Sequence, residues 1–135
     1  MSRRTFRTFV GLVLSVAASQ MHAGAADLYV IANAPLKLSN AELSDVFLGE
    51  RQFANGQRLV VIDNAAVLSK FVAEACGVDA ARYRTVWAKK GFREGLNPPL
   101  QLSSDREVAA IVRSTPGAIG YVSTVQPGVA VIAAY

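Results

Sequence analysis

A helix–turn–strand unit at residues 104–122 constrains the fold of this chain most strongly. The helix is marked by an apolar face and by a Ser–Glu capping box, which are made by Val108, Ile111, Val112, Ser104 and Glu107. A Pro-Gly pair at 116–117 ends the helix, and an apolar strand follows at once. Gly120 in the middle of that strand indicates either a close backbone approach or a bulge. The unit therefore needs further elements packed around it.

The rest of the chain continues the alternation of strands and helices. Apolar runs predict strands at 28–32, 58–63 and 129–132, and Asn55-Gly56 predicts a turn. Helical spacing predicts a helix opened by Ser39, one from about 65 to 76, and one capped by Asp79, while the glycines and prolines of 91–102 predict a loop. This order predicts an α/β fold, a largely parallel sheet flanked by helices.

The first 25 residues have the three parts of a secretory signal peptide. Arg3, Arg4 and Arg7 precede an apolar run, and Ala23-Gly24-Ala25 suits cleavage after Ala25. The Arg pair also fits a twin-arginine signal, although Arg7 stands where that pattern has an apolar residue. We therefore expect a signal peptide at 1–25, one domain at 26–135 and export to the periplasm, with the general secretory route favoured.

Charge and reactive residues limit the classes of function. The whole chain has a net charge of +4, but residues 26–135 hold eleven Lys and Arg against ten Asp and Glu. That balance argues against nucleic acid as a partner. Cys76 is the only cysteine and is expected to be a buried, inert thiol, and the only histidine, His22, lies in the leader. We expect no metal site, no cofactor and no enzymatic activity.

Several motifs occur in an order that resembles the periplasmic phosphate-binding proteins of ABC transporters. They are the Leu-Ser to Phe-Leu-Gly segment at 36–49, the strand at 56–61, Phe71, Trp87 with the Gly- and Pro-containing stretch to 99, and Pro-Gly-Ala-Ile-Gly-Tyr-Val at 116–122. The resemblance covers nearly all of residues 26–135. It implies a single lobe of the type 2 periplasmic-binding-protein-like fold, because the chain has about half the length of a two-lobed member.

The resemblance also implies a place and a chemistry for a site. Such lobes bind phosphate-like anions at a helix N-terminus, and the matching segment here is Asp63, Asn64, Ala65, Ala66 and Val67. The family has an arginine and small hydroxyl residues there, whereas this chain has a carboxylate and alanines. We therefore expect weak binding through backbone N–H groups, and arginine at position 63 is expected to strengthen it.

Alternative interpretations remain for these residues and for the function. Asp63 and Asn64 suit either a ligand site or an Asx turn that caps the next helix. The cations of 82–93, interleaved with Tyr83, Trp87 and Phe92, suit either an anionic partner or the solvated face of a helix. Two classes of function follow. One is a solute-binding module for an ABC importer, and the other is a periplasmic adaptor or sensor partner that has lost its ligand. A homodimer suits either class.

Overall fold

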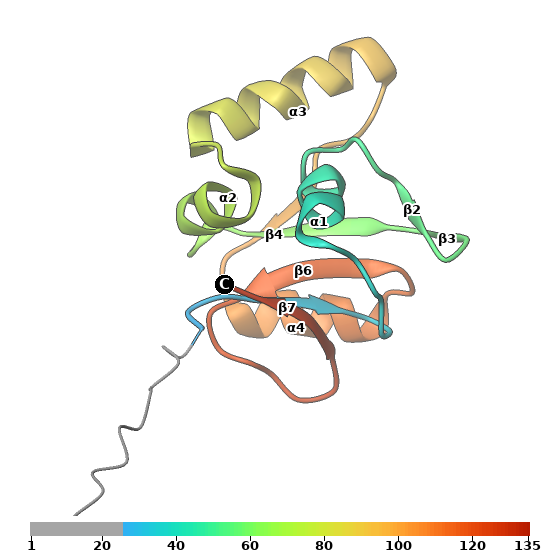
Figure 1. Ribbon diagram of the computed structural model, residues 1–135, viewed down its shortest axis with the longest axis vertical. Coiled ribbons are helices and arrows are strands. Elements are labelled where there is room, and N and C mark those ends of the chain that lie inside the picture. Colours follow the sequence, from blue (N-terminus) through green and yellow to red (C-terminus); the bar gives the residue numbers. More distant parts are fainter. Residues whose placement is uncertain (1–25) are drawn as a thin grey trace, which may run out of the picture.

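A five-stranded sheet with helices on both faces forms the body of the protein (Figure 1). The computed structural model describes residues 26–135, so the expected signal peptide at 1–25 lies outside the described residues. In chain order the elements are β1 (Tyr29–Ala32), α1 (Asn40–Phe47), β2 (Phe53–Ala54), β3 (Gln57–Arg58), β4 (Val60–Asn64), α2 (Leu68–Cys76), α3 (Ala80–Glu94), β5 (Leu100–Leu102), α4 (Asp105–Ser114), β6 (Ala118–Val122) and β7 (Ala130–Ala134).

The sheet is mixed. Its strand order is β5-β4-β6-β1-β7, and β4 pairs in parallel with both β5 and β6. β1 pairs antiparallel with β6 on one side and with β7 on the other. Four strands therefore run in one direction and β1 runs against them. The largely parallel sheet expected from the alternation is corrected to this arrangement, while the α/β class is confirmed.

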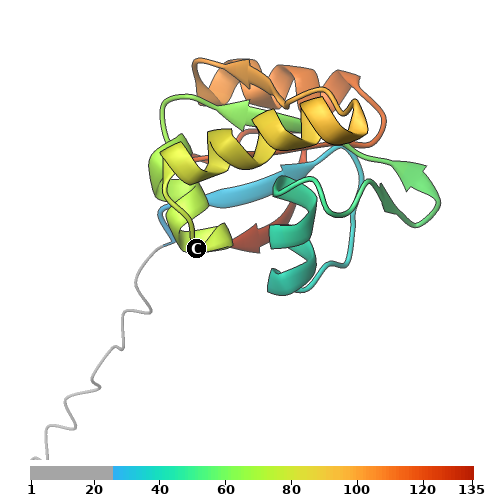
Figure 2. The ribbon, with the colours of Figure 1, turned by 90° about the horizontal axis from the view of Figure 1, so that it is seen from above.

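The two faces of the sheet carry separate hydrophobic clusters. One lies under α1, α2 and α3 and includes Leu43, Phe47, Phe71, Trp87 and Tyr121. The other lies under α4 and includes Ile31, Ile62, Val108, Val112 and Val122. Figure 2 shows α4 on the opposite side of the sheet from the other helices. Because neighbouring residues of a strand point to opposite faces, the three inner strands β1, β4 and β6 contribute to both clusters.

α1 and α4 begin directly after the predicted capping residues Ser39 and Ser104. The glutamates of the two predicted capping boxes do not bond as they do in an ideal box. The Ser39 Oγ accepts from the Glu42 amide at 3.1 Å, and the Ser104 Oγ accepts from the Glu107 amide at 3.3 Å. Glu107 in turn accepts from the Ser103 amide, whereas Glu42 binds Arg51 at 2.7 Å. The hydroxyl half of each predicted box is confirmed.

Two boundaries differ from the sequence expectation. The expected loop at 91–102 contains the last turn of α3 and all of β5, which pairs with β4 from Ile62 to Asn64. The helix expected from about residue 65 starts at Leu68, after a turn. Asn55 and Gly56 do form a turn, and both have positive φ between the short strands β2 and β3.

Gly120 confirms the close approach expected of it. A Cβ at this position would lie 2.9 Å from the Val108 Cγ1 and 3.2 Å from the Ile62 carbonyl oxygen. Its hydrogen atom lets α4 pack directly against β6. Among the helices of residues 26–135, none has both the length and the apolar character needed to cross a membrane.

Candidate functional site

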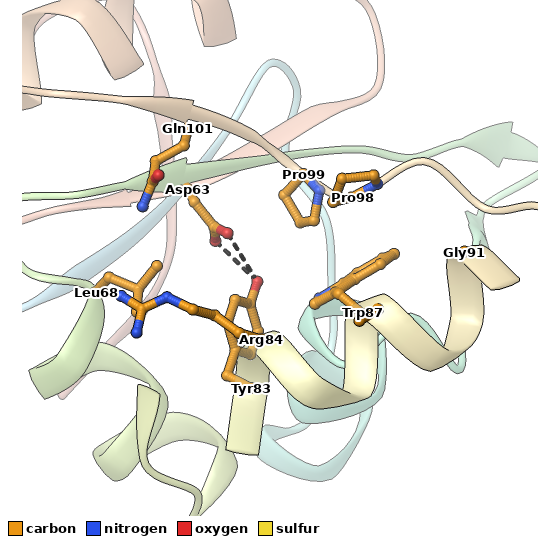
Figure 3. Close-up of a pocket in the computed structure, with 10 residues that line it drawn as sticks. Asp63, Leu68, Tyr83, Arg84, Trp87, Gly91, Pro98, Pro99 and Gln101 are labelled. Carbon is orange, nitrogen blue, oxygen red and sulfur yellow. Dashed lines mark hydrogen bonds between the residues drawn. The ribbon is translucent and has the colours of Figure 1, made fainter. Parts of the chain in front are cut away.

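Asp63 lies near the end of β4 and points toward α3 (Figure 3). Its carboxylate accepts the Tyr83 hydroxyl at 2.9 and 3.0 Å and the Tyr121 hydroxyl at 3.1 Å. Burial raises the pKa of Asp63 to about 6, and the two tyrosine hydrogen bonds oppose that rise. Asp63 is therefore a buried, partnered carboxylate at the base of the helical layer.

The tyrosines around Asp63 belong to the core. Tyr121 is fully buried and stacks on Phe71 with ring centroids 3.8 Å apart, as expected of a core residue. Burial, and then the nearby Asp63 charge, raise the pKa of both Tyr83 and Tyr121 above the usual value, so both stay protonated donors. The three side chains form one hydrogen-bonded cluster that joins β4, α3 and β6.

Asn64 points to the other face of the sheet. Its Nδ2 donates to the Asp105 carboxylate at 2.8 Å and to the Tyr121 carbonyl oxygen at 3.2 Å, and its Oδ1 accepts from the Ala66 amide at 3.1 Å. The last bond is the predicted Asx turn. Asn64 does not cap α2, because the N-cap residue is Val67 and no side chain bonds there.

Asp105 already occupies the amide groups at the end of β6. Its carboxylate accepts from the Ser123 amide, the Ser123 hydroxyl and the Thr124 amide at 2.7–3.0 Å. Burial would raise the pKa of Asp105, but these bonds and the one from Asn64 outweigh it and hold the pKa below its usual value. The Asp105 carboxylate therefore occupies the amide groups that an external anion would otherwise bind at the end of β6.

The N-terminus of α2, near the end of β4, is not capped by a side chain from the described part of the chain. Ala65 and Ala66 are exposed, and the Ala65 amide donates to the Leu102 carbonyl oxygen. Within residues 26–135, the amides of Leu68, Ser69 and Lys70 have no hydrogen-bond acceptor, because the first helical bond comes from Phe71 to Val67. These amides and the helix dipole favour negative charge there.

A pocket of about 460 Å³ lies beside this helix start, between α3 and the segment leading into β5. Its walls are largely apolar, and its polar groups are Asp63, Tyr83, Arg84 and Gln101. In Figure 3 the Arg84 side chain extends along the pocket toward Leu68. Sequence analysis did not assign Arg84 to the site. Arg84 directly follows the buried Tyr83 and lies three residues before the buried Trp87, and this spacing gave no sign of which neighbour its side chain would meet.

Asp63 and Arg84 thus stand at different depths of one pocket. The Asp63 carboxylate is already bonded at the base, so arginine at position 63 would place a large cation in the core rather than beside an anion. Arg84 already supplies a cation beside the start of α2. The sequence-predicted segment 63–67 is therefore divided, with Asp63 and Asn64 buried on opposite faces and Ala65, Ala66 and Val67 at the surface turn.

Other reactive groups lie away from this pocket. Cys76 is half-buried, and burial raises the pKa of its thiol to about 11, so it is protonated at neutral pH, as expected of an inert thiol. No group of three or more His, Cys, Asp or Glu side chains in residues 26–135 is placed to hold a metal ion.

Comparison with known proteins relates the chain to solved structures. No protein-family model matches the chain, and no curated protein matches it. It is similar to the crystal structure of an ABC-type phosphate transport receptor from Vibrio cholerae, with a TM-score of 0.60 and 16% sequence identity. The chain adopts a periplasmic-binding-protein-like fold. The match covers 79% of this chain and 45% of the receptor chain, so it spans less than half of the receptor. The single-lobe fold class expected from the sequence is thereby confirmed.

Proposed function

We propose that this chain is an exported, non-catalytic solute-binding module that takes a small anion, such as phosphate, at the start of α2. Within the expected segment Asp63, Asn64, Ala65, Ala66 and Val67, the proposed site uses the surface turn 65–67, together with the first amides of α2 and Arg84, while Asp63 and Asn64 are buried beneath it. The observation that carries the proposal is the open first turn of α2 beside Arg84 at one pocket. The fold shared with part of a phosphate receptor supports it.

Binding by this arrangement is expected to be weak. Three backbone amides and one exposed arginine supply the favourable interactions, and the pocket is open on one side, so water screens them. The Asp63 carboxylate repels an anion that enters deeply, more strongly once it ionises above its pKa of about 6. We expect a dissociation constant in the millimolar range, about 4 kcal/mol of binding free energy.

Calorimetric titration of the protein with phosphate, sulfate and an uncharged sugar tests the proposal. Phosphate should bind in the millimolar range and the sugar should not bind. Arg84→Gln should weaken phosphate binding by about fivefold, the usual scale for one exposed charge pair. Arg82→Gln removes the same charge from another exposed position of α3 and should leave binding unchanged. Equal effects of the two substitutions would contradict the assignment of Arg84.

A second candidate is an adaptor that binds another periplasmic protein or the membrane components of an ABC transporter, alone or as a homodimer. The observation that favours it is the buried Asp63 carboxylate at the pocket base, which opposes anions. Under this alternative, phosphate and sulfate give no heat of binding and Arg84→Gln has no effect. N-terminal sequencing of material from the periplasm tests export for both candidates, with a start near Ala26 expected.

A further inference from the structure

The outer stripe of α3 is a basic surface with one large apolar residue in it. The stripe consists of Arg82, Thr85, Lys89, Phe92 and Arg93, all of them exposed. These residues recur at helical spacing on the side away from the buried Tyr83 and Trp87. The ring of Phe92 is 93% exposed, more than the other exposed large apolar side chains of residues 26–135. The stripe therefore combines one fully projecting apolar ring with three cations on a single face of the helix.

The cations of the stripe are not used within the fold. Across residues 26–135 the ion pairs involve Arg51, Lys70 and Lys90, and none involves Arg82, Lys89 or Arg93. α3 holds five of the eleven Lys and Arg of residues 26–135 but one of the ten acids. The rest of the domain is therefore negative while α3 is positive. Such an asymmetry orients the protein in the field of an anionic surface.

The stripe is also a ridge rather than a groove. Figure 1 places α3 at one end of the long axis, outside α1 and α2, and Figure 2 shows its full length at the surface. A convex helix meets a flat partner along its length. The long side chains of Arg82, Lys89 and Arg93 are not fixed by ion pairs within residues 26–135. They can therefore adjust to a surface whose negative charge is spread out, rather than to a single acceptor.

We propose that the outer stripe of α3 binds an anionic lipid surface, with Arg82, Lys89 and Arg93 at the headgroups and Phe92 inserted at the boundary with the acyl chains. Each lysine or arginine near such a surface strengthens binding about fivefold. The ring of Phe92 adds an apolar contribution, which alone accounts for about a tenfold effect. This role is separate from the anion site, because Arg84 lies toward the pocket and outside the stripe.

The observations favour lipid over a nucleic acid. Binding of single strands uses stacking platforms of several aromatic rings beside a basic groove. On α3 the rings of Tyr83 and Trp87 are buried and Phe92 is the only one at the surface of the helix. Three cations that are unpaired within the described chain, together with one apolar ring, suit a shallow contact with anionic headgroups, where charge supplies most of the binding.

A site-specific fluorophore tests the proposal in the full chain. The probe reports contact at one position, which is needed because the apolar run within the first 25 residues could itself bind vesicles. In a Cys76→Ala background, Phe92→Cys carries an environment-sensitive probe, and Phe53→Cys carries the same probe on the β2–β3 hairpin, where Phe53 is 52% exposed. Vesicles of equal phosphatidylglycerol and phosphatidylcholine should shift the emission of the probe at position 92 to the blue. Phosphatidylcholine vesicles should not, and the probe at position 53 should respond to neither.

Charge variants give a second readout. Neutralising Arg82, Lys89 and Arg93 together to glutamine should weaken vesicle binding by roughly a hundredfold. A matched triple of exposed cations outside α3, Lys37, Arg58 and Arg106 to glutamine, should change it far less. An unchanged emission at position 92, equal shifts at both probe positions, or equal effects of the two triples would overturn the proposal. Binding to polyglutamate or RNA without binding to vesicles would also overturn it.

Discussion

At the scale of single residues, the pair Asp63 and Asn64 shows what the sequence could and could not predict. The Asx turn followed from residue type, because asparagine bonds its own backbone two residues on. The two side chains point to opposite faces of the sheet, and which face holds the tyrosines depends on contacts 20 and 58 residues away along the chain. No local pattern contains that information, so the buried cluster of Asp63 with the two tyrosines was missed.

The Asp63 cluster predicts an unusual pH dependence of stability. The carboxyl pKa is 3.8 in the unfolded chain and about 6 in the fold, so the folded state holds the proton more tightly. The stabilisation is therefore complete below about pH 4 and is lost as the pH rises through 6, at a cost of about 3 kcal/mol. Denaturant unfolding at a series of pH values measures this loss.

The matched variant is Asp63→Asn, which keeps an oxygen that accepts the tyrosine hydroxyls and cannot ionise. The difference in unfolding free energy between this variant and the parent should be small at pH 4 and should favour the variant at pH 7. A difference that does not change with pH would show that Asp63 titrates normally in the fold.

At the scale of elements, Tyr83 and Trp87 are buried on the inner side of α3, which supports the reading of its cations as a solvated helix face. The Trp87 ring is 8% exposed and its Nε1 donates to the Phe47 carbonyl oxygen at 3.0 Å. The end of α3 and β5 were missed for a physical reason. Gly91 and Pro98-Pro99 suggest a loop locally, but the Gly91 position is helical and β5 exists only because β4 offers an open edge.

Two aromatic residues of α3 should respond very differently to truncation. Trp87→Ala opens a cavity between α3 and α1 and should lower the unfolding free energy by about 3–5 kcal/mol. Phe92→Ala lies on the same helix at an exposed position and should change it by less than about 0.5 kcal/mol. Thermal and urea unfolding of both variants check this, and similar losses would contradict the assigned orientation of the helix.

The contact between α4 and β6 gives a test of packing at a single glycine. Gly120→Ala places a methyl group 2.9 Å from the Val108 Cγ1, so α4 must shift outward. The loss should be about 1–3 kcal/mol. Val108→Ala removes the clashing methyl groups, and the double variant should be more stable than the sum of the two single losses implies. Strict additivity in urea unfolding would show that the two positions are not in contact.

At the scale of the whole molecule, the alternation of elements determined the fold class but not the direction of each strand. A parallel neighbour needs a long crossover, and helices supply one between β4, β5 and β6. β1 instead lies between β6 and β7 and runs antiparallel to both. That choice depends on the complete set of strands, so residue patterns could not predict it.

This topology predicts which parts of the molecule open first. β6 is buried at every position and lies between β4 and β1, whereas β5 has a free edge and two of its three residues are exposed. Amide hydrogen exchange should therefore be slowest in β6 and β1, faster in β7, and fastest in β5 and the β2–β3 hairpin. Exchange followed by mass spectrometry or NMR on the same sample compares all of these strands directly. If β5 exchanged as slowly as β6, the edge of the sheet would have to be covered, and the strand order described above would need a further neighbour.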